Sequence, residues 1–303
     1  MEGLLIRAEK DPNEQNKTKL QDELQSEDNY YQLHQLIREF LKKKHNNLAS
    51  GQQQISHFCQ AMIDVAKTIP EQPIQEDIKK LKLNIPHLEE VAEHLIDVVS
   101  DENLDWPFIG LGRFYEGQGL YNLAEPWREQ CVSLLKQRLG DDHPHVATSF
   151  NNLAALYESQ GRYSEAEPLY KQALALRQKL LGDDHPAVAT SFNNLAALYE
   201  SQGRYSEAEP LYKQALALRQ KLLGDDHPDV ATSFNNLAML YDSQGRYSEA
   251  EPLYIQALNI LEQRLGVDHP HTITVRNNLE YLRQQTLDNP GFWRKAINFF
   301  FRK

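Results

Sequence analysis

The sequence contains few cysteines, a deficit of positive charge and no long apolar run. Only Cys59 and Cys131 occur among 303 residues, too few for a disulfide scaffold, so a reducing compartment is expected. The net charge is -11, and an acidic chain lacks the basic field that a general nucleic-acid-binding protein needs. No apolar run of about 18 residues occurs, and residues 1–17 lack the apolar core of a signal peptide. We therefore expect a soluble cytoplasmic protein that does not bind nucleic acid.

Signatures of catalysis are also missing. The sequence has no GxxxxGK[ST] motif, and the glycines between residues 110 and 119 are not spaced as GxGxxG. No carboxylate pair, Ser/His/Asp set or Cys/His set stands apart from a repeating background. Residues copied in every repeat are better explained by stacking than by catalysis. We predict a non-enzymatic protein without a cofactor.

An internal repeat of 42 residues dominates the second half of the chain. HPHVAT begins at residue 143, HPAVAT at 185, HPDVAT at 227 and HPHTIT at 269. Residues 143–184 and 185–226 differ only in having His145 or Ala187, whereas 227–268 departs from 185–226 at 11 positions. Such a period is typical of stacked supersecondary units that share a continuous core.

The first part of each repeat predicts an amphipathic helix, here called helix A. In the first full repeat, apolar residues recur at steps of three and four: Val146, Phe150, Leu153, Ala154 and Tyr157. We expect this helix to begin after an N-cap at His143, with Pro144 as its first residue, and to end before Gly161.

The second part of each repeat predicts another helix, here called helix B. Its apolar stripe in the first full repeat contains Ala166, Leu169, Tyr170, Ala173, Leu174, Leu176 and Leu180. Ser164 and Glu167 have the spacing of a capping box, and Gly182 is expected in the αL conformation at the C-terminal cap. Each repeat is therefore predicted to form a helical hairpin followed by a short polar loop.

The remaining parts of the chain are assigned from weaker copies of this pattern. We expect a polar, partly disordered N-terminus (1–27), a divergent helical region (28–100), a degenerate repeat (101–142), full repeats (143–184, 185–226, 227–268), a capping helix (269–288) and a basic aromatic tail (289–303). Within the divergent region, apolar stripes predict helices at 33–41, 55–66 and 88–99. In the capping helix, Arg276, Glu280 and Arg283 replace apolar residues, which predicts a solvent-facing surface.

The order of large and small residues in each repeat resembles the tetratricopeptide (TPR) signature. The matching residues of the first full repeat are Phe150, Leu153, Ala154, Tyr157, Ala166, Tyr170 and Ala173. The 42-residue spacing, with NNLA in helix A and SEAEPLYKQAL in helix B, is similar to that of kinesin light chains. This resemblance implies an all-α fold, a right-handed superhelical solenoid of antiparallel helix hairpins whose concave face is lined by helix A.

The resemblance allows several roles. A TPR array implies a scaffold or adaptor that binds a protein or peptide in its groove. A kinesin light chain would couple cargo to a microtubule motor through the kinesin heavy chain, near the cytoskeleton, although residues 20–48 offer only three or four heptads for a coiled coil. The near-identical repeats also resemble cyanobacterial TPR proteins, which implies the sensor array of a bacterial signalling system.

The candidate binding residues are those of helix A that lie off its packing stripe. Paired asparagines offer both donors and acceptors to the backbone of an extended peptide. They are Asn151 and Asn152, Asn193 and Asn194, Asn235 and Asn236, and Asn277 and Asn278. Alternatively, one asparagine of each pair bonds to the neighbouring hairpin's backbone and only supports the stack. Glu158, Glu200 and Asp242 follow on the same helices and favour a neutral or basic ligand.

Recurring histidines beside aspartates form a second pattern. His143, His185 and His227 each follow two aspartates, but equivalent positions lie one hairpin apart, too far for a shared zinc ion. We therefore expect polar loops and no metal site. Cys131 occupies the Ala173 position and Cys59 lies on an apolar stripe, so both are expected to be buried small residues.

The tail (residues 289–303) differs from the rest of the chain because it contains four basic residues and no acidic one. Its candidate contact residues are Phe292, Trp293, Arg294, Lys295, Phe299, Phe300, Arg302 and Lys303. The tail is too short to span a bilayer, but an amphipathic segment can lie in a membrane interface. It either folds back onto the last hairpin, contacts a membrane surface as in a peripheral assembly factor, or docks on a partner.

Overall fold

The computed structural model describes residues 49–288. Within this range the chain forms twelve α-helices and no strand, as the all-α prediction required. The chain divides into two compact units, Met1–Leu120 and Tyr121–Lys303. None of the helices between residues 49 and 288 has both the length and the apolar character that crossing a membrane requires.

The described part of the first unit, residues 49–120, forms four α-helices and two short 3-10 helices. They are α2 (Ala49–Thr68), α3 (Gln75–Leu81), α4 (Ile85–His94), η1 (Ile96–Val98), η2 (Asp101–Asn103) and α5 (Trp106–Glu116). Ile55, Cys59 and Ile63 of α2 form a core with Val91 and Val99. The helix predicted at 55–66 is therefore confirmed as part of α2.

Two details of the first unit differ from the sequence prediction. The helix expected at 88–99 begins at Ile85 and ends at His94, and α3 was not predicted. Because Pro86 lies in the first turn of α4, where no backbone donor is needed, the helix starts one residue before it. The chain leaves the α-helix at Leu95, and Leu95 and Ile96 pack against the core with α2.

Gly110 shows why α5 can approach α2 closely. A Cβ atom at this position would lie 2.9 Å from the Cβ of Ala66 and 3.0 Å from Cδ2 of Leu88. These separations are shorter than ordinary van der Waals contacts, so a larger residue would force the helices apart.

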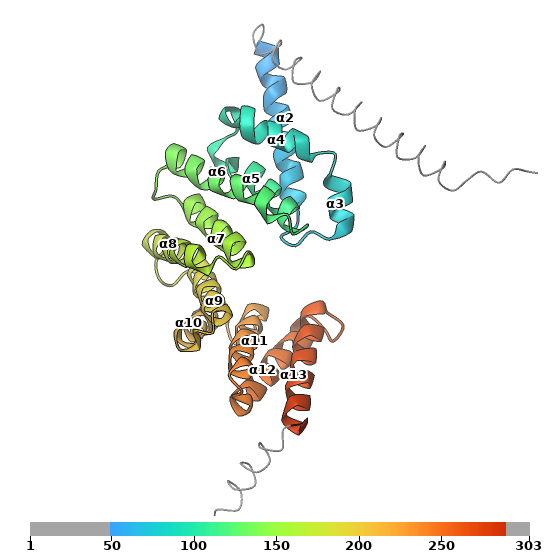
Figure 1. Cartoon of the computed structure of the whole chain (residues 1–303), viewed down its shortest axis with the longest axis vertical. Helices are drawn as coiled ribbons and strands as arrows, with labels where there is room; N and C mark the ends of the chain where they lie inside the picture. The colour runs from blue at the N-terminus through green and yellow to red at the C-terminus, as the bar shows by residue number, and fades with distance from the viewer. Residues whose placement is uncertain (1–48, 289–303) are drawn as a thin grey trace, which may run out of the picture. The chain divides into compact units, whose positions relative to one another are not determined.

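The second unit is a row of helical hairpins (Figure 1). Its helices are α6 (Tyr121–Leu139), α7 (Pro144–Ser159), α8 (Tyr163–Leu181), α9 (Pro186–Ser201), α10 (Tyr205–Leu223), α11 (Pro228–Ser243), α12 (Tyr247–Arg264) and α13 (Pro270–Asp288). The pairs α7/α8, α9/α10 and α11/α12 are the predicted hairpins of helix A and helix B. Each helix B also packs against helix A of the next hairpin, which joins the hairpins into one core.

Alanines occupy the most crowded positions between these helices. Ala154, Ala166 and Ala173 are all 0% exposed, as are their counterparts in the next two repeats. Small side chains let helices approach closely, and the neighbouring tyrosines fill the space that remains. The packing predicted from the signature residues is confirmed.

The ends of helix A follow the sequence prediction. His143 is the N-cap of α7, and its Nδ1 accepts a hydrogen bond from the backbone N–H of His145 at 3.2 Å. His185, His227 and His269 accept the same bond in α9, α11 and α13. The recurring histidines therefore act as caps, which accounts for their place before each proline.

The ends of helix B follow the prediction only in part. Gly182 has a φ of 81° after α8, a value that favours glycine, but its ψ of 164° is extended and not αL. The predicted capping box of Ser164 and Glu167 is wrong, because α8 begins at Tyr163 without a side-chain cap. Glu167 instead accepts a hydrogen bond from Arg204 of the following hairpin.

The last described helix, α13, adds ion pairs to the solvent-facing surface that was predicted for it. Arg283 is exposed as expected and Arg276 is partly exposed, but each also pairs with a glutamate of α12, which was not predicted. The Arg276–Glu262 distance is 2.8 Å and the Arg283–Glu251 distance is 2.7 Å. Glu280 is exposed as expected. The replaced apolar positions are thus used to hold α13 to the preceding hairpin.

Several predicted segments lie outside the described residues. They are the polar N-terminus (1–27), the helix at 33–41, the heptads of 20–48 and the basic aromatic tail (289–303). The tail residues Phe292, Trp293, Arg294, Lys295, Phe299, Phe300, Arg302 and Lys303 fall in this set.

Candidate functional site

The paired asparagines of helix A meet across successive hairpins. In three repeats the second asparagine donates from Nδ2 to Oδ1 of the first asparagine in the preceding repeat. The bonds are Asn194 to Asn151 at 2.8 Å, Asn236 to Asn193 at 2.8 Å and Asn278 to Asn235 at 3.1 Å. We call this row of bonds on α7, α9, α11 and α13 the asparagine ladder, and the surface that carries it the ladder face.

The ladder retains unused hydrogen-bonding capacity. An asparagine side chain has two N–H donors and an acceptor oxygen, and one ladder bond uses only one group of each partner. The bonded asparagines are partly exposed, and Asn277, which begins the last pair, is exposed. Asn152 lies before the first rung and is partly exposed too. The alternative expected one asparagine of each pair to bond to the backbone of the neighbouring hairpin, whereas the bonds found join side chain to side chain. The ladder face stays accessible.

Two carboxylates on the same helices accept hydrogen bonds from tyrosines of their own hairpins. Glu158 accepts a hydrogen bond from the Tyr170 hydroxyl and Glu200 accepts one from Tyr212, both at 2.8 Å. Partial burial raises the pKa of Glu158, Glu200 and Asp242 above ordinary carboxylate values. The sequences of α7, α9 and α11 contain no lysine or arginine, so the charge along these helices is negative.

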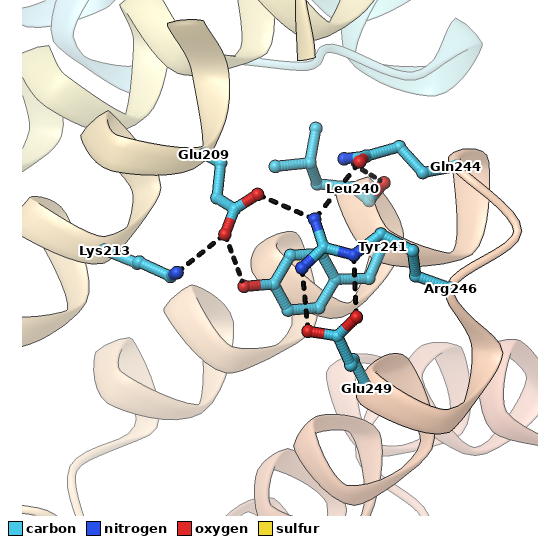
Figure 2. A network of polar contacts seen from close by, with 7 residues as sticks. All are labelled: Glu209, Lys213, Leu240, Tyr241, Gln244, Arg246 and Glu249. Atoms are coloured by element: carbon cyan, nitrogen blue, oxygen red, sulfur yellow. Dashed lines mark hydrogen bonds and ion pairs between the residues drawn. The ribbon is translucent and has the colours of Figure 1, made fainter. Parts of the chain in front are cut away.

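A network centred on Glu209 links two hairpins (Figure 2). Glu209 of α10 accepts hydrogen bonds from the Tyr241 hydroxyl at 3.0 Å, Arg246 Nη1 at 2.7 Å and Lys213 Nζ at 2.6 Å. The Arg246 guanidinium stacks over the Tyr241 ring, 4.0 Å from its centroid, and also pairs with Glu249. These cationic donors hold the pKa of Glu209 at about 2.

The same network occurs one hairpin earlier. Glu167 of α8 binds Tyr199 and Arg204, and the Arg204 guanidinium lies 4.1 Å from the Tyr199 ring centroid. We call each of these networks a junction clamp. The clamps were not predicted from the sequence, although the Arg-x-x-Glu and Glu-x-x-x-Lys spacings at helix starts are the signals that indicate them. The clamps fix successive hairpins and therefore the spacing of the ladder rungs.

A second contact between hairpins varies along the row. Arg219 of α10 is half-buried, and its Nη1 donates to Ser233 Oγ of α11 at 2.7 Å. Arg177 of α8 makes the equivalent bond to Ser191 of α9 at 2.8 Å. At the last junction these positions are Leu261 and Val275.

A cavity opens at this last junction. It is lined by Thr232, Asn235, Leu261, His271, Thr274 and Val275, from α11, α12 and α13. Asn235 belongs to the ladder, so the cavity adjoins the ladder face. Leu261 and Val275 give it an apolar floor, and the other lining side chains are polar.

The residues considered for metal binding or thiol chemistry are otherwise engaged. Between residues 49 and 288, no group of three or more His, Cys, Asp or Glu side chains is arranged to hold a metal ion. Cys59 and Cys131 are both buried, and burial raises the pKa of the Cys59 thiol to about 11. A thiol with so high a pKa is a poor nucleophile.

Comparison with known proteins agrees with this architecture. The tetratricopeptide repeat family model matches residues 105–179, 159–221 and 207–263, which together cover just over half of the chain. No curated protein matches this sequence significantly.

Solved structures of repeat proteins are similar to this one. A Podosopora anserina protein provisionally assigned as a kinesin light chain, with nearly identical TPR-like repeats, is 26% identical, with a TM-score of 0.56 over 70% of this chain and 98% of that one. A point variant of that protein is 29% identical, with a TM-score of 0.52 over 62% and 89%. BtubC (BKLC) from P. vanneervenii, at 23% identity, shares the fold with a TM-score of 0.53 over 74% and 95%.

Proposed function

Because this chain belongs to the tetratricopeptide repeat family, whose fold is a scaffold for protein interactions, we propose that it binds an extended peptide segment of a partner protein along the ladder face. The face acts as a groove lined by α7, α9, α11 and α13. The protein performs no reaction on the bound segment, and its role is to hold partners together.

The asparagine ladder is the observation that carries this proposal. Amides recur at each repeat, linked by bonds of 2.8–3.1 Å, and they retain donors and acceptors for a peptide backbone. Because the clamps hold neighbouring hairpins together, the rungs are preorganised, which lowers the entropy cost of binding. The carboxylates of α7, α9 and α11 favour a segment that is neutral or basic.

The test compares amides on and off the ladder face. Partners are captured with the full chain, the bound segment is mapped, and its affinity is measured as a synthetic peptide by fluorescence anisotropy. Replacing Asn151, Asn193 and Asn235 together by Ala is expected to weaken binding about tenfold or more, since each lost hydrogen bond contributes about 0.5–1.5 kcal/mol.

A matched control removes three exposed amides of helix B, through Gln172→Ala, Gln214→Ala and Gln256→Ala. This variant is expected to bind like the wild type. The single change Asn277→Ala removes an exposed amide ahead of the last rung and should weaken binding without lowering the melting temperature. Equal affinity of all three variants would refute the ladder face as the binding site.

A second candidate is a light-chain-like subunit of a microtubule motor. It is favoured by the similarity of the repeats to those of the Podosopora anserina protein. Co-precipitation of a kinesin heavy chain with the full chain would support this role. Capture of other partners without a heavy chain, from a lysate in which the heavy chain is detected, would reject it.

A further inference from the structure

The last junction of the hairpin row differs from the two before it in a way that opens space. Upstream, the half-buried Arg219 reaches α11, where it bonds to Ser233 Oγ and, at 3.4 Å, to the Asp229 carbonyl oxygen. One repeat later these three positions are Leu261, Val275 and His271. Leucine is several atoms shorter than arginine, and all three residues line the cavity of the last junction.

The surface beside this cavity is more apolar than its upstream counterparts. Met239 and Tyr281 stand where the earlier repeats have Ala155 and Ala197. They are 42% and 62% exposed, respectively. The Asn235 amide contacts the Met239 sulfur at 3.3 Å, which places Met239 beside both the ladder and the cavity. Met239, Tyr281 and the cavity-lining residues together form what we call the apolar end of the ladder face.

The charge and the length of the tail (residues 289–303) favour it as the occupant of the apolar end. The helices of the ladder face carry Asp229 and Asp242, whereas Arg276 and Arg283 of α13 are paired with glutamates of α12. The tail has four basic residues, no acidic one, and aromatic residues at 292, 293 and 299–301. A basic aromatic segment thus complements an acidic face that ends in apolar side chains.

The tail is also long enough. It follows directly after Asp288 at the end of α13, and Thr274 of the cavity lies 14 residues earlier on this helix. That distance along the helix is about 21 Å at about 1.5 Å per residue. An extended chain covers about 3.3 Å per residue, so roughly seven residues reach the cavity. The tail has fifteen, and residues 299–301 lie beyond the minimum.

We propose that the basic aromatic tail of this chain docks along the apolar end of the ladder face and inserts an aromatic side chain into the cavity between α11 and α13. This inference rests on the ladder face being the peptide-binding surface. The docked tail occupies the last rungs and competes with an external segment, so the chain regulates access to its own binding face.

Photo-crosslinking within the full chain tests the proposal without any partner. Phe300 is replaced by p-benzoylphenylalanine, and crosslinked peptides are mapped by mass spectrometry after irradiation of dilute protein. The expected products join residue 300 to Met239, Leu261 or Val275 of the same chain.

Two double variants convert the apolar end into the upstream arrangement. Leu261→Arg with Val275→Ser restores the arginine and serine of the preceding junctions, and Met239→Ala with Tyr281→Ala restores their alanines. Because both pairs of residues occur natively in neighbouring repeats, the variants are expected to fold, and circular dichroism checks this. The crosslink yield is expected to fall about tenfold in the first, the equivalent of about 1.4 kcal/mol, and less in the second.

Several results would overturn the proposal. They are crosslinks between chains, crosslinks elsewhere in the chain, crosslinks only to added phosphatidylglycerol vesicles, or yields unchanged in both folded variants. The capture assay with the ladder variants reads the external partner separately. A failed crosslink with ladder-dependent capture therefore rejects the docked tail alone, whereas ladder-independent capture rejects the proposed function.

Discussion

The α10/α11 and α12/α13 junctions each pack a helix B against the helix A of the next hairpin, but with different side chains at equivalent positions. Arg219 and Ser233 join the former through a hydrogen bond, while Leu261 and Val275 give the latter an apolar floor beneath a cavity. The first junction, α6/α7, is intermediate, with a fully buried Leu135 and a Ser149 hydroxyl that bonds to the Val146 carbonyl oxygen. Near-identical repeats can therefore form different junctions through two side chains on equivalent helices.

The two kinds of junction should also differ in stability. A half-buried arginine without an ion pair contributes mainly through its hydrogen bonds, and burial lowers its pKa, as at Arg219. Leu261 is 1% exposed and contributes through removal of its apolar surface from water. Substitutions at matched positions separate these two contributions.

The largest effect is expected from Leu261→Ala. It should lower the free energy of unfolding by about 2–5 kcal/mol, because it deletes buried apolar atoms beside an existing cavity. Arg219→Ala should cost about 0.5–1.5 kcal/mol, the value of a net hydrogen bond. Urea unfolding followed by circular dichroism measures both, and a larger cost for Arg219→Ala would contradict the comparison.

The junction clamps make the next comparison. Glu209→Gln removes the charge that binds Arg246, Lys213 and Tyr241, and should cost about 1.5–3 kcal/mol at pH 7. At the last junction Glu251 binds Arg283 with both side chains about half exposed, so Glu251→Gln should cost less than about 1 kcal/mol. Equal costs in urea unfolding would show that the clamp at Glu209 is no stronger than a surface ion pair.

The junction clamp at Glu209 also predicts that the free energy of unfolding decreases at acid pH. The folded-state pKa of Glu209 is about 2, below its ordinary value of 4.5, so the folded state favours the ionised form. This stabilisation is present above pH 4.5 and is lost as the pH falls towards about 2. The stability difference between wild type and Glu209→Gln should therefore shrink over that range, as measured by urea unfolding at several pH values.

The outer surface of α13 provides a third comparison. Ala238 is 0% exposed, and Ala238→Leu should cost about 1–3 kcal/mol through overpacking. Glu280 occupies the same repeat position in α13 but is exposed, so Glu280→Leu should change stability by less than about 0.5 kcal/mol. Thermal unfolding of the two variants measures the difference, and similar losses would mean that α13 is covered on this side.

The smallest effect concerns the carboxylates of helix A. Burial raises the folded-state pKa of Glu200, so its contribution to stability is present below the ordinary value of 4.5 and is lost as the pH rises through the raised value. Glu200→Gln, whose amide oxygen can still accept from Tyr212, should stabilise the protein by up to about 0.5 kcal/mol at pH 7. The gain should vanish near pH 4, and Asp242→Asn should behave in the same direction; a gain that grows on acidification would contradict this assignment.

Local sequence signals predicted most of the hairpins. The 3-and-4 apolar spacing located helix A and helix B, and the His-Pro pairs located the start of each helix A. The same local logic failed where a side chain had a distant partner. Ser164 and Glu167 have capping-box spacing, yet Glu167 accepts a hydrogen bond from Arg204, which is 37 residues away. Arg276 and Arg283 keep part of their side chains exposed, as predicted, but their ion pairs with α12 were not predicted.

The candidate site was likewise predictable within one repeat but not between repeats. Repetition of the asparagines and their place off the apolar stripe were visible in the chain, but their pairing over 43 residues was not. Substitution of Arg219 and Ser233 by Leu261 and Val275 was also visible, but nothing in a one-dimensional pattern indicates that these two positions face each other across a junction.

Periodic apolar residues, small residues and caps act within one repeat, so the amino-acid sequence was enough to predict helical hairpins in tandem. Which side chains of neighbouring repeats meet depends on how one hairpin packs against the next, and this was visible only in the folded chain. The ladder, the clamps and the cavity all arise from this packing.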